Sequence, residues 1–98
     1  MLWYRKHLSR EGMVLALADQ DLMDKNFEEG DFLLSITSFY KGELIAREEV
    51  ASLLGEAKII NAVGEGAVAV LLESGLTTKE TIRKTAGIPH VQTVKITI

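Results

Sequence analysis

The sequence of 98 residues lacks cysteine altogether and contains a single proline, Pro89. Without thiols the chain can form no disulfide, no thiol nucleophile and no zinc site built on thiolates. The absence of cysteine fits a reducing compartment, so we expect a cytoplasmic protein. The two histidines, His7 and His90, lie far apart in the sequence and form no short metal-binding motif, so we predict no metal site.

Long apolar segments and aromatic residues are also scarce. No apolar run approaches the roughly 20 residues that a helix needs to cross a bilayer. Residues 1–12 lack the apolar stretch of a signal peptide, and we expect no membrane partner. Hydrophobic residues make up 47% of the chain and aromatic residues only 6%. These proportions predict one compact domain over residues 1–98 with a mainly aliphatic core.

The common nucleotide, calcium and catalytic motifs are missing as well. Gly64 and Gly66 match two positions of GxGxxG, but the third position is Ala69, so we interpret these glycines as sites of close packing. The acidic segment 19–31 lacks the ligand spacing of an EF-hand and is expected to be a solvated loop. No serine lies in a GxSxG motif. We therefore predict no cofactor, no catalytic residue and a non-enzymatic protein.

Charge is unevenly distributed along a chain whose net charge is −3. Residues 1–12 carry three cations and one acid, and residues 76–98 carry four cations and one acid. Between them, residues 13–75 carry four cations and twelve acids. Because proteins that bind nucleic acid non-specifically are usually basic throughout, this balance argues against that class. It predicts a local basic patch if residues 1–10 and 79–95 meet, with Arg5 or Lys6 near Arg83 or Lys84.

The pattern of apolar residues predicts an α+β fold. Alternating, β-branched or aromatic segments predict strands at 2–8, 13–20, 32–40, 43–46 and 91–98, the first two as an antiparallel hairpin. A helical turn is expected at 21–24 and a helix at 47–57. The order of strands, then helices, then a strand predicts a mainly antiparallel sheet with two or so helices packed on one face. We expect the last strand to be internal, with Val94 and Ile96 buried beneath the helices.

The segment 58–75 allows two interpretations. Its apolar residues follow helical spacing, but Gly64 and Gly66 each cost roughly 1 kcal/mol against alanine inside a helix. Either two helices pack closely at these glycines, or a break precedes a helix at 65–74. In both cases Gly75 is expected to end the helix.

The segment 87–92 also allows two interpretations. Pro89 fixes its own backbone and favours an extended residue before it, which suits the entry to a strand. Alternatively, the rigid backbone presents His90 and Gln92, which share one face of the strand, beside a functional cleft. Whether Pro89 is cis or trans stays open.

Three segments of the chain resemble a known family. They contain Phe-Tyr-Lys-Gly at 39–42, Val-Gly-Glu at 63–65 and Pro-His-Val-Gln at 89–92. Over nearly its whole length the chain resembles the small archaeal family catalogued as domain of unknown function 424, in which a glycine is expected at the turn where this chain has Asp24. The family has no established activity. Its association with archaeal information processing implies a role in translation or RNA binding.

These observations lead to one functional hypothesis and two alternatives. The hypothesis is a module that binds RNA or a ribonucleoprotein, because cations near aromatic side chains suit single-stranded RNA. Its candidate binding residues are Arg5, Lys6, His7, Arg83, Lys84, His90 and Gln92. The first alternative is a small hydrolase or transferase that uses His90 as general base. The second is a protein–protein adaptor, or a homodimer, that pairs through an exposed edge strand.

Overall fold

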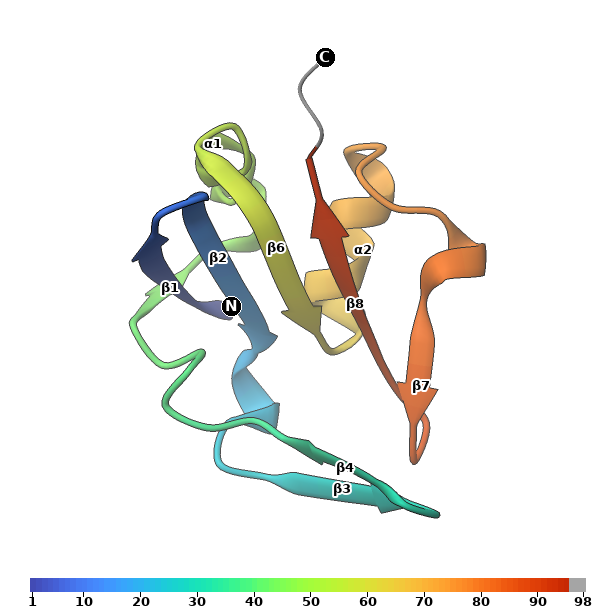
Figure 1. Cartoon of the computed structure of the whole chain (residues 1–98). Coiled ribbons are helices and arrows are strands. Elements are labelled where there is room, and N and C mark those ends of the chain that lie inside the picture. The colour runs from blue at the N-terminus through green and yellow to red at the C-terminus, as the bar shows by residue number, and fades with distance from the viewer. Residues whose placement is uncertain (96–98) are drawn as a thin grey trace.

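A computed structural model describes residues 1–95, and Figure 1 shows the arrangement of its elements. Six strands form the main sheet: β1 (Leu2–Ser9), β2 (Gly12–Asp19), β5 (Glu43–Ile45), β6 (Ala57–Val63), β7 (Arg83–Thr85) and β8 (Ile88–Val94). β3 (Asn26–Glu29) and β4 (Phe32–Ser35) form a separate hairpin. The helices are α1 (Ala51–Leu54) and α2 (Glu65–Glu73), with 3-10 turns η1 (Gln20–Leu22), η2 (Arg47–Glu49) and η3 (Lys79–Thr81).

The strands of the main sheet follow the order β5-β1-β2-β6-β8-β7. All neighbours are antiparallel except β2 and β6, which run parallel at the centre of the sheet. The α-helices pack against β2, β6 and β8 on one side, behind the sheet in Figure 1. The predicted α+β fold, mainly antiparallel with helices on one face, is confirmed.

Local signals placed several elements correctly. The predicted hairpin is β1–β2, with Ser9 opposite Gly12 at the turn. The predicted helical turn is η1. Asp24 follows it with φ of 65°, a left-handed conformation that glycine adopts freely and aspartate tolerates. This explains why a glycine would suit that turn. The strand expected at 32–40 is shorter, because β4 ends at Ser35 and the chain then turns back towards β1.

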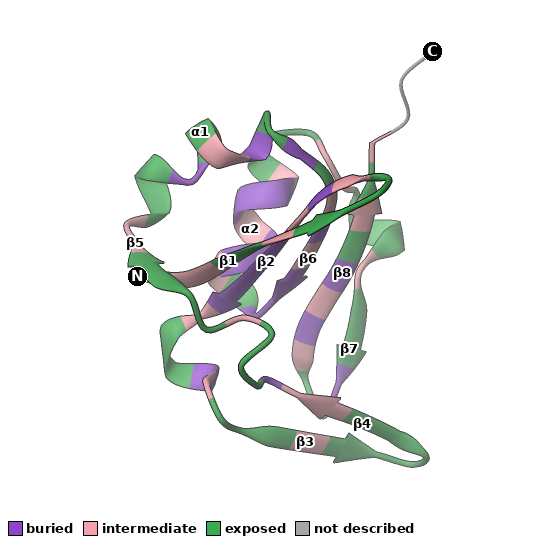
Figure 2. Ribbon diagram, turned by 60° about the vertical axis from the view of Figure 1, so that its left-hand side comes forward, coloured by how far each residue is buried: buried purple, intermediate pink, exposed green. Residues whose placement is uncertain are grey.

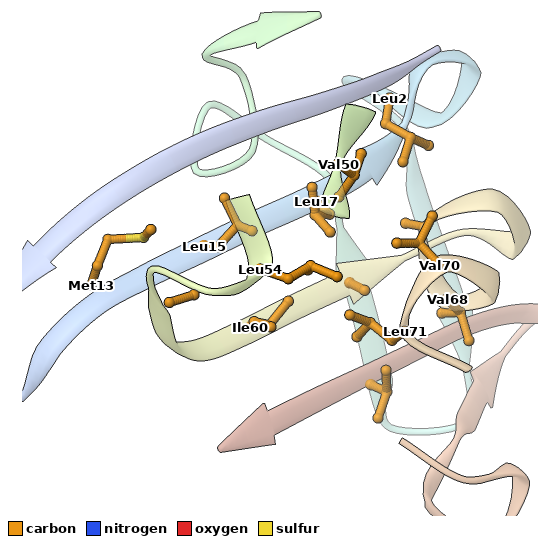
Figure 3. Close-up of a cluster of buried hydrophobic side chains, with 14 residues drawn as sticks. Leu2, Met13, Leu15, Leu17, Val50, Leu54, Ile60, Val68, Val70 and Leu71 are labelled. Atoms are coloured by element: carbon orange, nitrogen blue, oxygen red, sulfur yellow. The ribbon is translucent and has the colours of Figure 1, made fainter. Parts of the chain in front are cut away.

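The main hydrophobic core lies between the sheet and the helices (Figure 3). Leu15 and Leu17 of β2 and Ile60 of β6 are fully buried and pack in one cluster with Val68 and Leu71 of α2. None of the buried members of this cluster is aromatic, as the composition predicted. Each such side chain contributes roughly 1.5–3 kcal/mol when it leaves water.

A second, smaller core lies on the opposite face of the sheet. Ala18 of β2 and Val63 of β6 are buried there with Leu22 and Ile36, which lie at the two ends of the β3–β4 segment. Figure 2 shows the hairpin crossing one end of the sheet and projecting beyond it. This core therefore fixes the base of the hairpin and leaves its tip exposed.

The structure corrects the interpretation of residues 58–75. The helical interpretation of the first part is wrong, because β6 extends to Val63 and α2 begins only at Glu65. A break before a helix near 65 is confirmed, and so is the end of that helix. Gly75 has φ of 76°, and Leu76 N donates to Leu71 O over 3.0 Å, as in a left-handed helix terminus.

Gly64 joins β6 to α2 and lies against the end of β2. The carboxylate of Asp19 accepts hydrogen bonds from Gly66 N at 3.1 Å and Ala67 N at 2.8 Å. It thereby supplies a cap and a negative charge to the first turn of α2. Interpreting Gly64 and Gly66 as sites of close packing is confirmed, because a Cβ at either position would lie within 3 Å of Asp19. The chain's own carboxylate occupies the place where a phosphate binds in nucleotide loops.

The structure also corrects the orientation of the last strand. β8 begins at Ile88 and includes Pro89, whose peptide bond is trans. Val91 is 7% exposed and faces the helices, whereas Val94 is 52% exposed and faces away from them. The predicted burial of Val94 is wrong, because Val94 lies opposite Ile59 on the side of the sheet that the helices do not cover. Ile96 lies outside the described residues.

β8 lies between β6 and β7 in the order of the sheet, but only His90 pairs with both neighbours. β7 pairs with residues 88–90, and residues 91–94 pair with β6 alone. The predicted strand is therefore internal in the order of the sheet, but the expectation of a neighbour on both sides is wrong for residues 91–94, because β7 is too short to cover them.

Candidate functional site

The face of the sheet that points away from α1 and α2, here called the open face, consists of three rows of side chains. Strand pairing aligns Trp3, Ala18, Val63, His90 and Arg83 in the row nearest the hairpin. The middle row is Arg5, Ala16, Asn61 and Gln92. The third row is His7, Val14, Ile59 and Val94. The hairpin covers one end of this face, and the loop 37–42 covers the β1 side.

The predicted meeting of the basic termini is wrong. β2, β6 and β8 separate β1 from β7, which are four strand spacings, about 19 Å, apart. Arg5 and Arg83 do share the open face, but Lys6 and Lys84 point to the opposite side, where Lys6 pairs with Glu56 at 2.8 Å. The two basic segments are separated because the chain inserts β6 and β8 between them.

Arg5 and His7 hold the loop 37–42 against β1. Arg5 Nη1 donates to Ser38 O over 2.7 Å, and His7 Nε2 lies 2.8 Å from Phe39 O. The imidazole also stacks on the Phe39 ring, with centroids 4.3 Å apart. These two candidate residues therefore have a structural role on the β1 side.

A cleft opens at the other side of the sheet, between the hairpin, η3 and β7. Its volume is about 970 Å³, and it is lined by Glu29, Phe32, Lys79, Ile82, Arg83, Lys84, Thr85 and His90. Figure 1 shows the tip of the β3–β4 hairpin reaching towards the lower end of β7. Glu29 joins the two parts, because its Oε1 accepts a hydrogen bond from Ala86 N over 2.7 Å. Three of the predicted residues, Arg83, Lys84 and His90, thus line one cleft.

The cleft combines free cations with an exposed aromatic ring. Within residues 1–95, Lys79, Arg83 and Lys84 form no ion pair. Phe32 is 74% exposed, which is unusual for so large an apolar side chain. Such a pairing of positive charge and a solvent-facing ring can bind a ligand that is both anionic and aromatic.

His90 lies in the cleft and is half-buried. Its Nε2 is 3.0 Å from Thr85 Oγ1, and Thr85 is itself buried. Burial, and then the positive charge of Arg83, lower the pKa of His90 below its ordinary value. Both interpretations of the segment 87–92 therefore apply to His90. Its side chain stabilises the β7–β8 turn, and it also faces the cleft. Gln92 does not line the cleft, although it shares the open face with His90.

We expect His90 to titrate below about 6.5, the usual pKa of histidine. In the unfolded chain the imidazole binds a proton more readily, so stability should fall as the pH drops through the window between the two pKa values. The NMR shift of the His90 ring protons against pH measures the pKa directly. Arg83→Ala should raise that pKa, because it removes the nearby positive charge. A pKa at or above 6.5 in the wild type would contradict the geometry of this site.

A model of the family described as "Protein of unknown function (DUF424)" matches residues 7–96. The chain belongs to this family. It is also similar to a solved structure described as an uncharacterized conserved protein from Methanopyrus kandleri, with a TM-score of 0.82 and 28% identity over 99% of this chain and 96% of that one. No curated protein matches the chain.

This DUF424 chain shows no assembled metal site or membrane helix among the residues described. No group of three His, Asp or Glu side chains in residues 1–95 is placed to hold a metal ion. No helix in that part of the chain is long and apolar enough to span a bilayer.

The sequence analysis missed several residues at the site of this DUF424 member. Five of them line the cleft: Glu29, Phe32, Lys79, Ile82 and Thr85. A sixth, Asn61, lies beside Gln92 on the open face. The sequence did contain a signal for Asn61, because it is the only polar residue among the last five residues of β6. Phe32 carried none, because an exposed phenylalanine cannot be told from a core residue by its neighbours.

Proposed function

We propose that this protein is a non-enzymatic cytoplasmic module, of archaeal origin, that binds single-stranded RNA or a ribonucleoprotein linked to translation. The observation that supports this proposal is the cleft that the exposed ring of Phe32 lines together with three cations, Lys79, Arg83 and Lys84, all without ion pairs among the described residues.

The chemistry of the cleft matches a nucleotide. Cations bind phosphates and release counterions, and an exposed aromatic ring stacks on an unpaired base. Phe32 lies at the tip of a projecting hairpin, where it can meet a base that is not held in a duplex. Because the chain as a whole has a net charge of −3, binding at a defined site is favoured over general attraction of phosphates.

The alternative of a hydrolase or transferase has less support. A lowered pKa keeps His90 neutral near pH 7, which suits a general base. Its Nε2, however, is engaged by the hydroxyl of Thr85, which is buried and cannot act as a nucleophile on a bound substrate. Among residues 1–95 no carboxylate forms a hydrogen bond with the His90 ring to orient it.

The alternative of pairing through an edge strand also has less support. The two outermost strands, β5 and β7, have only three residues each. The edges of the sheet continue along residues 5–9 of β1 and residues 91–94 of β8, which pair on one side only. β7 carries Arg83 and Lys84, so a second copy that paired along it would bring like charges together. Short, charged edges are typical of sheets that resist such pairing.

We expect the double variant Arg83→Ala/Lys84→Ala to bind a single-stranded RNA of about 12 nucleotides at least tenfold more weakly than the wild type. Two lost phosphate contacts should also reduce the slope of log K against log salt by about 1.4. Fluorescence anisotropy across a salt series measures both quantities. The matched control is Arg10→Ala/Lys58→Ala, which removes two exposed cations away from the cleft. Equal losses in the two variants, or no RNA binding by the wild type at low salt, would refute the proposal.

A further inference from the structure

Two carboxamide side chains lie side by side on the open face. The chain contains only four of them, Gln20, Asn26, Asn61 and Gln92. Asn61 of β6 and Gln92 of β8 are direct cross-strand partners. Directly opposed residues place their Cβ atoms about 4.5–5.5 Å apart, so the two amides can contact one ligand group together.

These carboxamides have no partner within the described part of the chain. None of the side-chain hydrogen bonds of residues 1–95 involves Asn61 or Gln92, and no fully buried side-chain nitrogen or oxygen there lacks a partner. Their polar atoms therefore reach solvent from the middle of the sheet. Because no described residue uses the donors and acceptors of these two side chains, they remain available to a ligand.

The strands of the main sheet place no carboxylate on the open face, and the nearest described acid at the cleft is Glu29 of the hairpin. The six strands of the main sheet contain two acids, Asp19 and Glu43, and both lie on the helical side. Asp19 caps α2, and Glu43 accepts a hydrogen bond from Tyr4 over 2.9 Å. The strands contribute Arg5 and Arg83 to the open face and no carboxylate.

The carboxamide pair is continuous with the cleft. His90 lines the cleft and precedes Gln92 by two residues on the same face of β8, a separation of about 7 Å. Beyond Gln92, the exposed Val94 and half-buried Ile59 form an apolar surface of the kind that the flat face of a base can cover. A strand of RNA that leaves the cleft along β8 would meet these groups in order.

We infer that Asn61 and Gln92 form a base-reading subsite that selects adenine in the single-stranded RNA whose phosphates occupy the cleft; this inference rests on the proposed function. A carboxamide presents a donor and an acceptor side by side, which matches the N6 and N7 edge of adenine. In single-stranded RNA such edges are free of pairing partners. The cleft thus supplies affinity, and the carboxamide pair supplies the choice of base.

The four carboxamides allow a direct test by NMR. In a spectrum of ¹⁵N-labelled protein, the NH₂ signals of Asn61 and Gln92 should shift on addition of a 12-nucleotide oligoadenylate. The signals of Gln20 and Asn26 should stay unchanged and serve as internal controls. Oligouridylate of the same length should shift the backbone signals around the cleft and leave the NH₂ signals of all four carboxamides unchanged.

The binding experiment uses two variants and a matched control. The wild type should bind oligoadenylate about tenfold more tightly than oligouridylate. Gln92→Ala, at an exposed position, should reduce this ratio of affinities to threefold or less. Asn61→Ala/Gln92→Ala should abolish the preference for oligoadenylate. Both variants should bind oligouridylate as tightly as the wild type does. Gln20→Ala/Asn26→Ala should keep the full ratio.

The outcomes separate the inference from the proposed function. If the wild type binds both RNAs equally, or if Gln92→Ala keeps the full preference, the inferred adenine subsite is refuted. The proposal that the cleft binds RNA is then unaffected. If the Asn61 and Gln92 signals shift with protein concentration alone, the open face binds a second copy of the chain and the inference is overturned. If no RNA binds at low salt, both the proposed function and the inference fail.

Discussion

Replacing Gly64 with alanine should lower the free energy of unfolding by about 3 kcal/mol or more. Gly64 has φ of 102°, a conformation that strains any residue with a Cβ, at a cost of roughly 1–3 kcal/mol. The new methyl group would also lie 2.6 Å from Oδ2 of Asp19, so the carboxylate would have to move. Its two hydrogen bonds to the first turn of α2 would then be lost, which typically costs about another 1 kcal/mol.

Gly55→Ala is the matched control for this effect. Gly55 has ordinary helical dihedral angles, and nothing would lie within 4 Å of its Cβ. Alanine there should leave stability unchanged or raise it slightly, because it restricts the unfolded chain. Urea unfolding of both variants, followed by circular dichroism, gives the comparison. A Gly64→Ala protein as stable as Gly55→Ala would show that the Asp19 cap is not formed as described.

The second large effect is expected at Val91. Val91→Asp should destabilise the fold by about 3–5 kcal/mol, because it places a carboxylate without a partner between the sheet and α2. Val94→Asp, three residues further along the same strand, should change stability by no more than about 0.5 kcal/mol, since that side chain is 52% exposed.

The pair Val91→Asp and Val94→Asp tests which face of β8 is buried. Both variants make the same chemical change in one strand, so differences in β propensity largely cancel. Thermal unfolding at neutral pH, where both carboxylates are ionised in the unfolded chain, measures the two effects. The reverse order, with Val94→Asp the more damaging, would mean that β8 pairs with β6 in a register shifted by one residue.

Features that depend on neighbours in the sequence could be predicted. The β1–β2 hairpin has its strands on either side of one short turn, and the end of α2 is marked by Gly75. β6 could not be recognised, because Ile59 and Val63 make its open face almost as apolar as its helical side, so the strand shows little alternation. Its Ile59, Ile60 and Val63 continue into the apolar residues of α2 with spacing that imitates a single helix.

The candidate site was only partly predictable, for a related reason. The Pro-His sequence drew attention to His90, and His90 does lie in the cleft. The order of strands depends on pairing between residues far apart in the sequence, so the positions of Arg5 and Lys6 relative to Arg83 could not be predicted. For the same reason the pairing of Asn61 with Gln92 could not be predicted, because the two residues lie in different strands.

The parallel pairing of β2 with β6 also determines how the chain can fold. The β1–β2 hairpin can close within microseconds, whereas β6 must find β2 across the intervening residues 20–56, so the sheet is completed late. α2 has nine residues, too few to persist as an isolated helix. It becomes stable only when Asp19, at the end of β2, reaches its first turn. Helix formation and closure of the central strands are thereby coupled, and the domain is expected to fold in a single cooperative step without a stable partial structure.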